Sequence, residues 1–483
     1  MSRIILAVFL LAASISRLPA QEIFYSNEQK FTFQNRDFSV VGWCGSRLYA
    51  YRAGKEGYYL DAYNDSMRLL ATVTLDFFPQ KTAEAEFYAT GKEIIVLYQA
   101  EQRGEMLQYA AKLDTMGRMV QRPTVVASAK LGWLAADRKY FTSVASNDRS
   151  KIFIYNVSKQ KGRKTEFNTY LLDNALTVIA KGTPWIASDE NIYVQENILA
   201  NDGTFYMSAT GGSKGYSEDA WVFKLNPDGQ TLKNITIPLK DAYISGLHAK
   251  MDDANGQLLI CGFYTNRRSG NVDGIVYGRC DAATDTFSQY KQIPLDEDVR
   301  QMVDEKNKKR ALDDFVAKDM VVRNDGGFIL VAENYFVTTR NANYGAGFGY
   351  YGRYSNGYGG SIIREYHYGD IMILSYDGNG RKIWQNFVRK SQYSQDDGGL
   401  FSSYRMLNSG GSLVFLFNDF TSNRSTLNLA AVDGAGSLRL KKLNPGRTAG
   451  ADWIPRSGKQ IDIREMMVPV VRKNNLGFAR VVF

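Results

Sequence analysis

The sequence predicts an all-β fold, a single β-propeller of eight blades, from three observations. One unit, made of an apolar strand, a loop, an alternating strand, a tight turn and a further strand, recurs seven times in 483 residues. Asp-Gly turns such as Asp377-Gly378 join apolar runs, a pattern typical of β-hairpins. Strand-like segments at both ends of the chain fit an eighth unit. A propeller closes short strands radially and so protects their edges; seven blades, paired β-sandwiches and a β-solenoid are the alternatives.

Each unit opens with a short apolar strand, which follows a polar turn in most copies. Its seven copies are residues 47–51, 93–98, 151–155, 203–209, 257–262, 327–332 and 412–417. An alternating strand follows in every copy, at residues 57–63, 106–114, 168–172, 220–225, 274–279, 370–376 and 426–431. A third strand is clearest at residues 232–237, 383–388 and 438–443, each after a tight turn. Strands joined in this order form antiparallel sheets of three or four strands.

The two ends of the chain predict how the ring closes. Residues 466–471 and 476–483 read as the first two strands of an eighth blade that then stops. Residues 23–25 and 30–33 would supply its outer strands. Such a blade ties both ends of the chain into one sheet.

The first 20 residues have the pattern of a secretory signal peptide. Ser2-Arg3 supplies a positive start, residues 4–15 an apolar core and residues 16–20 a cleavage region. An uncleaved anchor is the rival reading, but the apolar run is short for a membrane span, and no later run is long enough. We therefore expect residues 21–483 to form one propeller domain, exported to the periplasm or the outer surface and without a transmembrane span.

Composition and charge exclude little except nucleic-acid binding. The formal charge of +9 falls to +7 without Arg3 and Arg17, and no basic run is long enough for a nucleic-acid footprint. A mildly basic surface is compatible with anionic glycans or membranes. The chain has two histidines, His248 and His367, far apart, and no cysteine cluster, so the sequence indicates neither a metal site nor a cofactor.

Two insertions interrupt the repeat. Residues 297–312 are rich in helix formers, with acids early and bases late, and predict a solvated connecting helix before the sixth unit; a basic binding helix is the alternative. Residues 337–369 form a Tyr/Gly-rich loop between the two central strands of that unit. The glycine-rich part is either an adaptable contact surface or a low-complexity insertion, whereas residues 362–368 alternate as an ordered strand does.

Propeller topology predicts that these insertions share one face. A loop between the second and third strands opens on the same face as the connection to the next blade. The helix, the Tyr/Gly-rich loop and the loops at residues 211–219 and 265–273 should therefore crowd one sector. The candidate binding residues there, chosen for aromatic faces, hydroxyls and charge, are Tyr350, Tyr351, Tyr354, Tyr358, Arg364, Tyr366, His367, Tyr368, Arg267 and Arg268.

No motif assigns a reaction. The chain lacks a Gly-x-Ser-x-Gly elbow, and the adjacent acids Asp313-Asp314 and Asp396-Asp397 are the weak candidates for carboxylate chemistry. Cys261 and Cys280 lie on successive strands of one predicted hairpin, which allows either a cross-strand disulfide or two buried thiols.

One stretch carries a resemblance. Residues 366–373, Asp377-Gly-Asn-Gly-Arg-Lys-Ile-Trp384 and Lys390-Ser-Gln392 resemble an uncharacterised family of secreted β-propeller proteins of Gram-negative bacteria. The resemblance is close over about thirty residues, and in the rest of the chain it extends only to the repeat architecture. It implies export and a propeller fold and brings no assigned catalytic residues.

The leading functional hypothesis is a non-enzymatic exported binding scaffold that engages a protein or glycan of the cell envelope through one propeller face. The alternatives are a carbohydrate-active hydrolase or lyase on the same scaffold, and a structural subunit of an envelope assembly. Inward-facing carboxylate pairs would favour the enzyme, and an aromatic face would favour binding.

Overall fold

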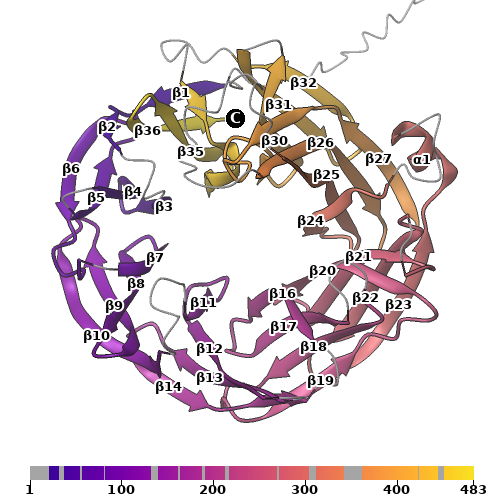
Figure 1. The fold of residues 1–483 in the computed structure, drawn as a ribbon, viewed down its shortest axis with the longest axis horizontal. Helices are drawn as coiled ribbons and strands as arrows, with labels where there is room; N and C mark the ends of the chain where they lie inside the picture. Colours follow the sequence, from indigo (N-terminus) through magenta and orange to yellow (C-terminus); the bar gives the residue numbers. More distant parts are fainter. Residues whose placement is uncertain are drawn as a thin grey trace, which may run out of the picture.

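Eight antiparallel sheets form a ring around a central axis, so the chain is an eight-bladed β-propeller, as predicted (Figure 1). The computed structural model describes residues 21–31, 37–54, 57–80, 82–131, 140–161, 164–187, 191–212, 217–268, 271–303, 312–341, 362–421, 424–443 and 451–483. In blades one to seven the first four strands pair in chain order, with the first strand nearest the axis. The additional strands of blades three and six, β15 and β28, pair with the third strand of their blade.

The first four blades contain the following strands. Blade one has β3 (Phe38–Cys44), β4 (Arg47–Gly54), β5 (Gly57–Tyr63) and β6 (Leu69–Thr74); blade two has β7 (Thr82–Ala89), β8 (Glu93–Gln102), β9 (Glu105–Asp114) and β10 (Met119–Lys130). Blade three has β11 (Thr142–Ala145), β12 (Ile152–Lys161), β13 (Lys164–Leu172), β14 (Val178–Gly182) and β15 (Trp185–Ala187); blade four has β16 (Ile192–Leu199), β17 (Phe205–Gly211), β18 (Asp219–Leu225) and β19 (Leu232–Thr236).

The next three blades carry the insertions. Blade five has β20 (Tyr243–Asp252), β21 (Gln257–Thr265), β22 (Gly274–Asp281) and β23 (Thr286–Pro294), and is followed by helix α1 (Glu297–Val303). Blade six has β24 (Phe315–Val322), β25 (Phe328–Asn341), β26 (Ile362–Tyr376), β27 (Lys382–Val388) and β28 (Gln392–Gln395); blade seven has β29 (Tyr404–Asn408), β30 (Ser412–Thr421), β31 (Arg424–Asp433) and β32 (Leu438–Lys442). Helix α1 confirms the start of the predicted helix, whose residues 304–311 lie outside the described residues.

Blade eight closes the ring with strands from both ends of the chain. It contains β33 (Asp452–Trp453), a 3-10 turn (Pro455–Ser457), β34 (Lys459–Asp462), β35 (Glu465–Arg472), β36 (Asn475–Val482), β1 (Glu22–Tyr25) and β2 (Gln29–Lys30). Both β1 and β2 pair with β36, which confirms the predicted closure. One detail was wrong: residues 466–471 and 476–483 form the two central strands, because β33 and β34 precede them on the other side of β35. Those two strands have only two and four residues, too short for a recognisable alternation.

The Asp-Gly turns fold as expected because the aspartate side chain caps the turn. In the turn between β26 and β27, one carboxylate oxygen of Asp377 accepts hydrogen bonds from the backbone nitrogens of Asn379 (2.9 Å) and Arg381 (2.8 Å). Gly380 adopts a φ of 74°, a conformation that costs glycine little. The hairpin signal in the sequence therefore has a local physical cause.

The hydrophobic core lies between neighbouring blades. Between blades five and six, for example, the rings of Tyr277 and Phe328 stack with centroids 4.3 Å apart, among buried Phe263, Leu330 and Tyr376. Burial on both faces of each sheet explains the near-continuous apolar character of the central strands.

The cysteines belong to two different inter-blade cores, so the disulfide alternative was wrong. Cys261 pairs with Tyr277 and Cys280 with Leu258, and this three-residue offset turns the two side chains to opposite faces of blade five. Cys261 packs toward blade six and Cys280 toward blade four. Both are buried free thiols.

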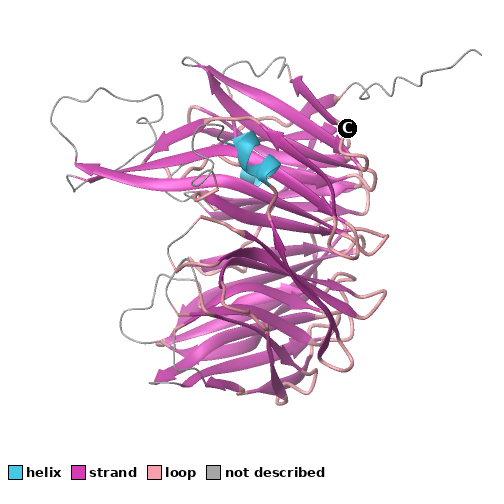
Figure 2. Cartoon of the chain, turned by 90° about the vertical axis from the view of Figure 1, so that its right-hand side faces the viewer, coloured by secondary structure: helices cyan, strands magenta, loops and turns pink. Residues whose placement is uncertain are grey.

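The two ends of the ring differ. Loops between the second and third strands of a blade, and connections between blades, open on one end, the loop face; tight turns lie on the other end, the turn face. Figure 2 shows the turns on the right and the long hairpin of β25 and β26 projecting to the left. In the part of the chain that the structure describes, no helix has the length and apolarity to span a membrane.

Candidate functional site

The most prominent feature of the loop face is a small sheet that continues blade six beyond the ring (Figure 2). After a register shift at Glu333 and Tyr335, residues 335–341 of β25 pair with residues 362–368 of β26. Strand β28 then pairs with the other edge of β26, from Tyr368↔Gln392 to Glu365↔Gln395. We name this three-stranded sheet the blade-six extension. Residues 362–368 form an ordered strand, as predicted. The first and last parts of the predicted loop are therefore strands that pair with each other.

The register divides the extension into two faces, because alternate residues of a strand point to opposite sides. The Glu365 face carries Phe336, Thr338, Arg340, Ile363, Glu365, His367, Tyr393 and Gln395. The Tyr368 face carries Tyr335, Val337, Thr339, Arg364, Tyr366, Tyr368, Gln392 and Ser394.

A hydrogen-bond network is centred on the Glu365 carboxylate. Its oxygens accept hydrogen bonds from the Tyr393 hydroxyl (2.6 Å), Arg340 Nε (2.8 Å), Thr338 Oγ1 (3.2 Å) and Gln395 Nε2 (3.4 Å). The Tyr393 hydrogen bond, followed by that of Arg340, lowers the pKa of Glu365 to about 2. Glu365 therefore stays ionised and holds three strands in one arrangement, which suits a fixed contact surface and not proton transfer.

Aromatic rings cover the same face. The His367 ring stacks on Phe336 with centroids 4.5 Å apart and an interplanar angle of 11°, and lies 5.2 Å from the Tyr393 ring. Thr338 Oγ1 is 3.3 Å from His367 Nε2. The Tyr393 side chain is 42% exposed although it belongs to a regular strand. Exposed aromatic surface held by a rigid sheet is typical of a binding site.

A buried ion pair supports the base of the extension. Lys390 Nζ lies 2.7 Å from Glu333 Oε1, and both side chains are fully buried. Ser403 Oγ of blade seven donates to Glu333 Oε2 at 2.7 Å, and Lys390 donates to Gln392 Oε1 at 3.0 Å. Burial lowers the pKa of Lys390, and the Glu333 charge opposes this effect. These contacts fix the position at which β25 leaves blade six.

Tyr368 is part of the supporting packing and not of an accessible surface. It is buried, its ring lies 4.6 Å from that of Tyr335, and its hydroxyl accepts a hydrogen bond from Arg456 of blade eight at 3.4 Å. Gly399 approaches so closely that a Cβ there would lie 2.6 Å from the Tyr368 ring. The expectation that Tyr368 contacts a ligand is therefore wrong, because the residue anchors the Tyr368 face on blades seven and eight.

The remaining predicted residues are divided among three places. His367 lies on the Glu365 face, whereas Arg364 and Tyr366 lie on the opposite face. Arg267 and Arg268 are exposed in the blade-five loop. Tyr350, Tyr351, Tyr354 and Tyr358 lie outside the described residues.

Helix α1 and the blade-five loop lie side by side, as predicted for this sector. Arg300 of α1 donates to the Val272 carbonyl at 2.6 Å, and the Leu312 nitrogen donates to Asn271 Oδ1 at 3.1 Å. On its other side the helix contacts blade six, where Arg389 donates to the Met302 carbonyl. The blade-four loop reaches blade five through a bridge between Ser217 and Ile244.

The adjacent acids Asp396 and Asp397 have structural roles. Asp396 Oδ1 accepts from the Arg364 nitrogen at 2.9 Å, and buried Asp397 accepts from Ser394 Oγ and the Gly399 nitrogen, both at 2.7 Å. They stabilise the turn after β28. Asp313 and Asp314 are exposed.

A second set of polar groups lies on the inner strands around the central axis. His248 of blade five donates to Glu196 of blade four at 2.7 Å, and Glu196 also accepts from the Ala249 nitrogen at 2.7 Å. Asp319 of blade six accepts from the Tyr404 hydroxyl of blade seven at 3.4 Å. Burial raises the pKa of Asp319 against the opposing charges of His248, Lys250 and Arg405. Groups of three or more His, Cys, Asp or Glu side chains suited to a metal are absent from the described part of the chain.

Sequence reasoning missed several residues of both sets. Arg340 and Glu365 fall within the range predicted as a loop, and Phe336 immediately precedes it, although the alternation in residues 362–368 was a signal that strand pairing continues. Tyr393 was missed because nothing local shows that β28 returns to pair with β26. The inner-strand groups come from different blades, and only ring closure brings them together.

Comparison with known proteins finds distant likenesses among solved structures. No family model and no curated protein sequence matches the chain. Among solved structures it is similar to the WD40 domain of SCAP from fission yeast, with 8% identity over 96% of this chain and 98% of that one and a TM-score of 0.44. It is similar to Porphyromonas gingivalis dipeptidyl peptidase 4, with 11% identity over 90% of this chain but 58% of that enzyme and a TM-score of 0.45.

A polysaccharide lyase of family PL25, an ulvan lyase, is also similar, with 12% identity over 79% of this chain and 90% of that one and a TM-score of 0.37. At these identities and TM-scores the likenesses carry no argument about the function of this chain.

Proposed function

We propose that the protein is an exported binding scaffold that engages a protein or glycan of the cell envelope through the Glu365 face of the blade-six extension. One observation carries the proposal: a rigid three-stranded sheet projects from the loop face and presents stacked and exposed aromatic rings around an ionised, fully hydrogen-bonded carboxylate. The buried pair of Glu333 and Lys390 supports it from below.

The chemistry of this face suits recognition of sugars or peptides. Phe336, His367 and Tyr393 offer ring faces for stacking, and Thr338 and Gln395 add hydrogen-bonding groups beside them. Rigid aromatic side chains bind with little loss of conformational entropy, since each has only two rotatable side-chain bonds. Arg340 and Glu365 neutralise each other at 2.8 Å, so the face discriminates by shape and hydrogen bonding more than by charge.

A carbohydrate-active enzyme is the second candidate, and its chemistry would lie at the inner strands. The observation in its favour is Asp319, whose pKa is raised by burial beside Tyr404. The observation against it is that the nearby carboxylate of Glu196 is engaged by His248 and the Ala249 nitrogen. A structural envelope subunit, with α1 as its contact, is the third candidate.

Export is part of the proposal and has its own test. Residues 1–20 have the pattern of a signal peptide, and a binding scaffold for envelope partners has to cross the inner membrane. We expect the mature protein, recovered from a periplasmic or outer-surface fraction, to begin at Gln21 by mass spectrometry. Recovery of the intact N-terminus from the cytoplasm alone would contradict this expectation.

The binding role is tested with a matched pair of variants. Residues 21–483 and the variant F336A/H367A/Y393A are compared as baits in an envelope extract and on an array of bacterial glycans. The control M116A/I463A removes two exposed apolar side chains from turns on the turn face. We expect the triple variant to lose the partners that wild type and control share. Identical partner lists for all three proteins would refute the binding role of the Glu365 face.

A further inference from the structure

Blade three is built in the same way as blade six. After its outer strand β14, the chain returns as β15, which pairs with the start of the third strand, from Glu166↔Trp185 to Lys164↔Ala187. In blade six β28 returns in the same way and pairs with β26. Residues 159–161 of β12 pair with the other edge of the same part of β13. These three segments form a small sheet at the loop face, which we name the blade-three extension.

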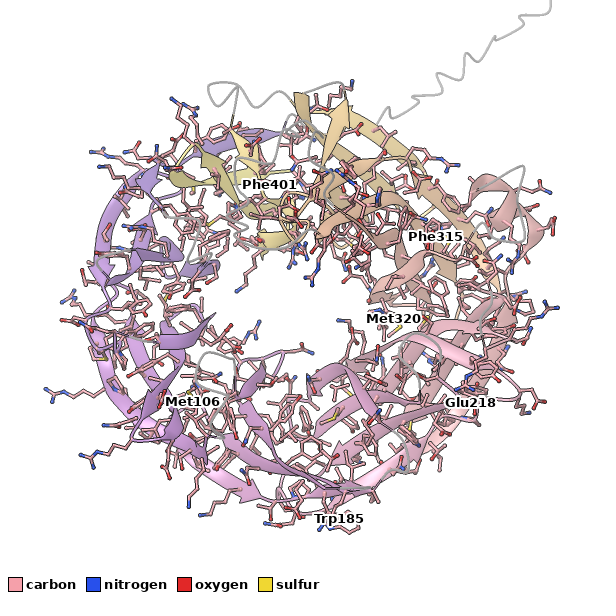
Figure 3. The ribbon with its side chains drawn as sticks, in the orientation of Figure 1. Met106, Trp185, Glu218, Phe315, Met320 and Phe401 are labelled. Carbon is pink, nitrogen blue, oxygen red and sulfur yellow. The ribbon has the colours of Figure 1, made fainter. Side chains whose placement is uncertain are left out.

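Each of the two returning strands carries an exposed aromatic ring. Trp185 on β15 is 52% exposed, and Tyr393 on β28 is 42% exposed. In the part of the chain that the structure describes, no other aromatic side chain is as exposed as either of them. Figure 3 shows Trp185 at the outer rim of the ring, away from the central opening. A large ring kept in water on a regular strand gives up the stabilisation that burial supplies, so packing of the fold does not account for it.

Two charged side chains flank the Trp185 ring. Glu166 is the direct cross-strand partner of Trp185, and Lys164, two residues earlier, projects from the same face of β13. Lys164 Nζ lies over the Trp185 ring, 4.7 Å from its centroid, and 3.0 Å from Glu166 Oε1. The ammonium and the carboxylate therefore form a neutral pair beside the ring. The Lys164 and Glu166 side chains are 46% and 30% exposed, so solvent reaches both.

The opposite face of β15 is anchored in the core, so the Trp185 ring is presented by a fixed strand. Ile186 is buried between blades three and four, where it packs with Phe167 and Phe205. The Phe167 nitrogen donates to the Pro184 carbonyl at 2.9 Å, which ties the residue before Trp185 to β13. A ligand that stacks on Trp185 therefore meets a ring whose backbone is already ordered, and this reduces the entropy lost on binding.

We propose that Trp185, Lys164 and Glu166 form a subsite for one pyranose unit of a neutral glycan. One face of a pyranose ring presents C–H bonds, which stack on the flat indole through dispersion contacts. The sugar hydroxyls both donate and accept hydrogen bonds, and the pair beside the ring offers an ammonium donor and carboxylate acceptors. Because the two charges cancel, an anionic sugar gains nothing over a neutral one. The subsite lies on a different blade from the Glu365 face and does not depend on a binding role of that face.

The test measures binding of neutral oligosaccharides to residues 21–483 by isothermal titration calorimetry. The probes are six-unit oligosaccharides of glucose, mannose, galactose, xylose and N-acetylglucosamine. Decaproline is the peptide probe, because proline-rich segments also dock on aromatic rings. We expect at least one oligosaccharide to bind, and W185A to weaken its binding at least about tenfold because the stacking surface is lost. K164A/E166A, which keeps the ring but removes the hydrogen-bonding pair, should weaken it severalfold.

Two further variants are the controls. I179A removes an exposed aliphatic side chain from β14 of the same blade and should bind as wild type does. F336A/H367A/Y393A removes the aromatic rings of the Glu365 face and should leave the binding at Trp185 unchanged. Circular dichroism and the unfolding temperature show that each variant is folded.

The outcomes separate this subsite from the Glu365 face. Loss of an oligosaccharide in W185A but not in I179A supports the subsite, whatever the triple variant does. Absence of binding for all five oligosaccharides overturns the proposal. Binding that W185A leaves as strong as I179A does also overturns it, and if the triple variant abolishes that binding, the sugar site is the Glu365 face. Decaproline binding that W185A abolishes, with no oligosaccharide bound, identifies a peptide ligand and overturns the assignment to a glycan.

Discussion

His248 and Glu196 join the inner strands of blades five and four through a hydrogen bond of 2.7 Å. The His248 ring also has a hydrogen bond with the backbone of Ala317 in blade six, which raises its pKa further. With an acceptor on both sides, the protonated imidazole, which donates from both ring nitrogens, is favoured over the neutral form. One residue therefore links three blades at the channel.

The first prediction concerns the pH dependence of this contact. Burial lowers the pKa of His248, but the hydrogen bond and charge of Glu196 outweigh it, so the folded-state pKa lies above the ordinary 6.5. Burial raises the pKa of Glu196, but His248 and the Ala249 nitrogen outweigh it, so its folded-state pKa lies below 4.5. The His248 contribution is complete below pH 6.5 and is lost as pH rises through the raised pKa. The Glu196 contribution is complete above pH 4.5 and is lost as pH falls through the lowered pKa.

We expect H248Q to destabilise the protein by about 2 kcal/mol between these two values, and by less at alkaline pH. Urea unfolding at a series of pH values measures the difference. E196Q and the double variant H248Q/E196Q are the controls, and the double variant should cost less than the sum of the single variants because they share one contact. A difference between wild type and H248Q that does not change with pH would contradict this reading.

A second prediction concerns the buried pair of Glu333 and Lys390. E333Q leaves the Lys390 ammonium buried without its counter-charge, so we expect a loss of about 3–5 kcal/mol in unfolding free energy. E333L/K390M removes both charges at similar volume and should cost much less. The midpoint of urea unfolding tests this, and a double variant as unstable as E333Q would show that the packing, and not the pairing, matters.

Ring closure leads to a third prediction. β1 pairs with β36, the Tyr25 ring lies 5.9 Å from Trp453, and Phe31 is buried in the core between blades eight and one. A chain that begins at residue 37 should therefore lose several kcal/mol of stability through lost apolar burial, and F31A alone about 3–5 kcal/mol. Thermal unfolding measures both. An unfolding temperature unchanged by the truncation would mean that the N-terminal strands do not close the ring.

The fourth prediction concerns Lys459, on strand β34 of blade eight. Its folded-state pKa, about 8, lies below the ordinary 10.5, so the unfolded chain binds more protons between these values and stability rises with pH across that range. K459M lacks this dependence. We expect K459M to be more stable than wild type at neutral pH, and this difference in unfolding free energy to shrink as pH rises. Urea unfolding at each pH measures it. A stability difference that grows with pH would contradict the claim that burial of the charged Lys459 side chain destabilises the folded protein.

The accuracy of the predictions from sequence depended on how far apart in the chain the interacting residues lie. The repeat, the Asp377 turn and the eighth blade were predictable because turn capping and strand alternation are local, and a propeller repeats them. The disulfide was wrong because the faces of Cys261 and Cys280 depend on a register that sequence spacing alone did not determine.

The residues predicted for binding and the residues of the proposed binding face overlap only in part. His367 was predicted as a binding residue, but its neighbours Phe336 and Tyr393 were not, because they meet only through the pairing of β25, β26 and β28. Tyr368 was misassigned because its packing on Gly399 and Arg456 joins residues from three blades. Contacts between residues so far apart in the chain leave no local pattern in the sequence.

Site-specific photocrosslinking tests the central claim most directly. The crosslinking amino acid p-benzoylphenylalanine replaces Tyr393, which is 42% exposed on the Glu365 face, or Met116, which is 40% exposed on the turn face. Both proteins are produced in the cells that normally make this one and are irradiated there. We predict an adduct of higher mass from position 393 and none from position 116. An adduct from position 116 with none from position 393 would contradict a binding role for the blade-six extension.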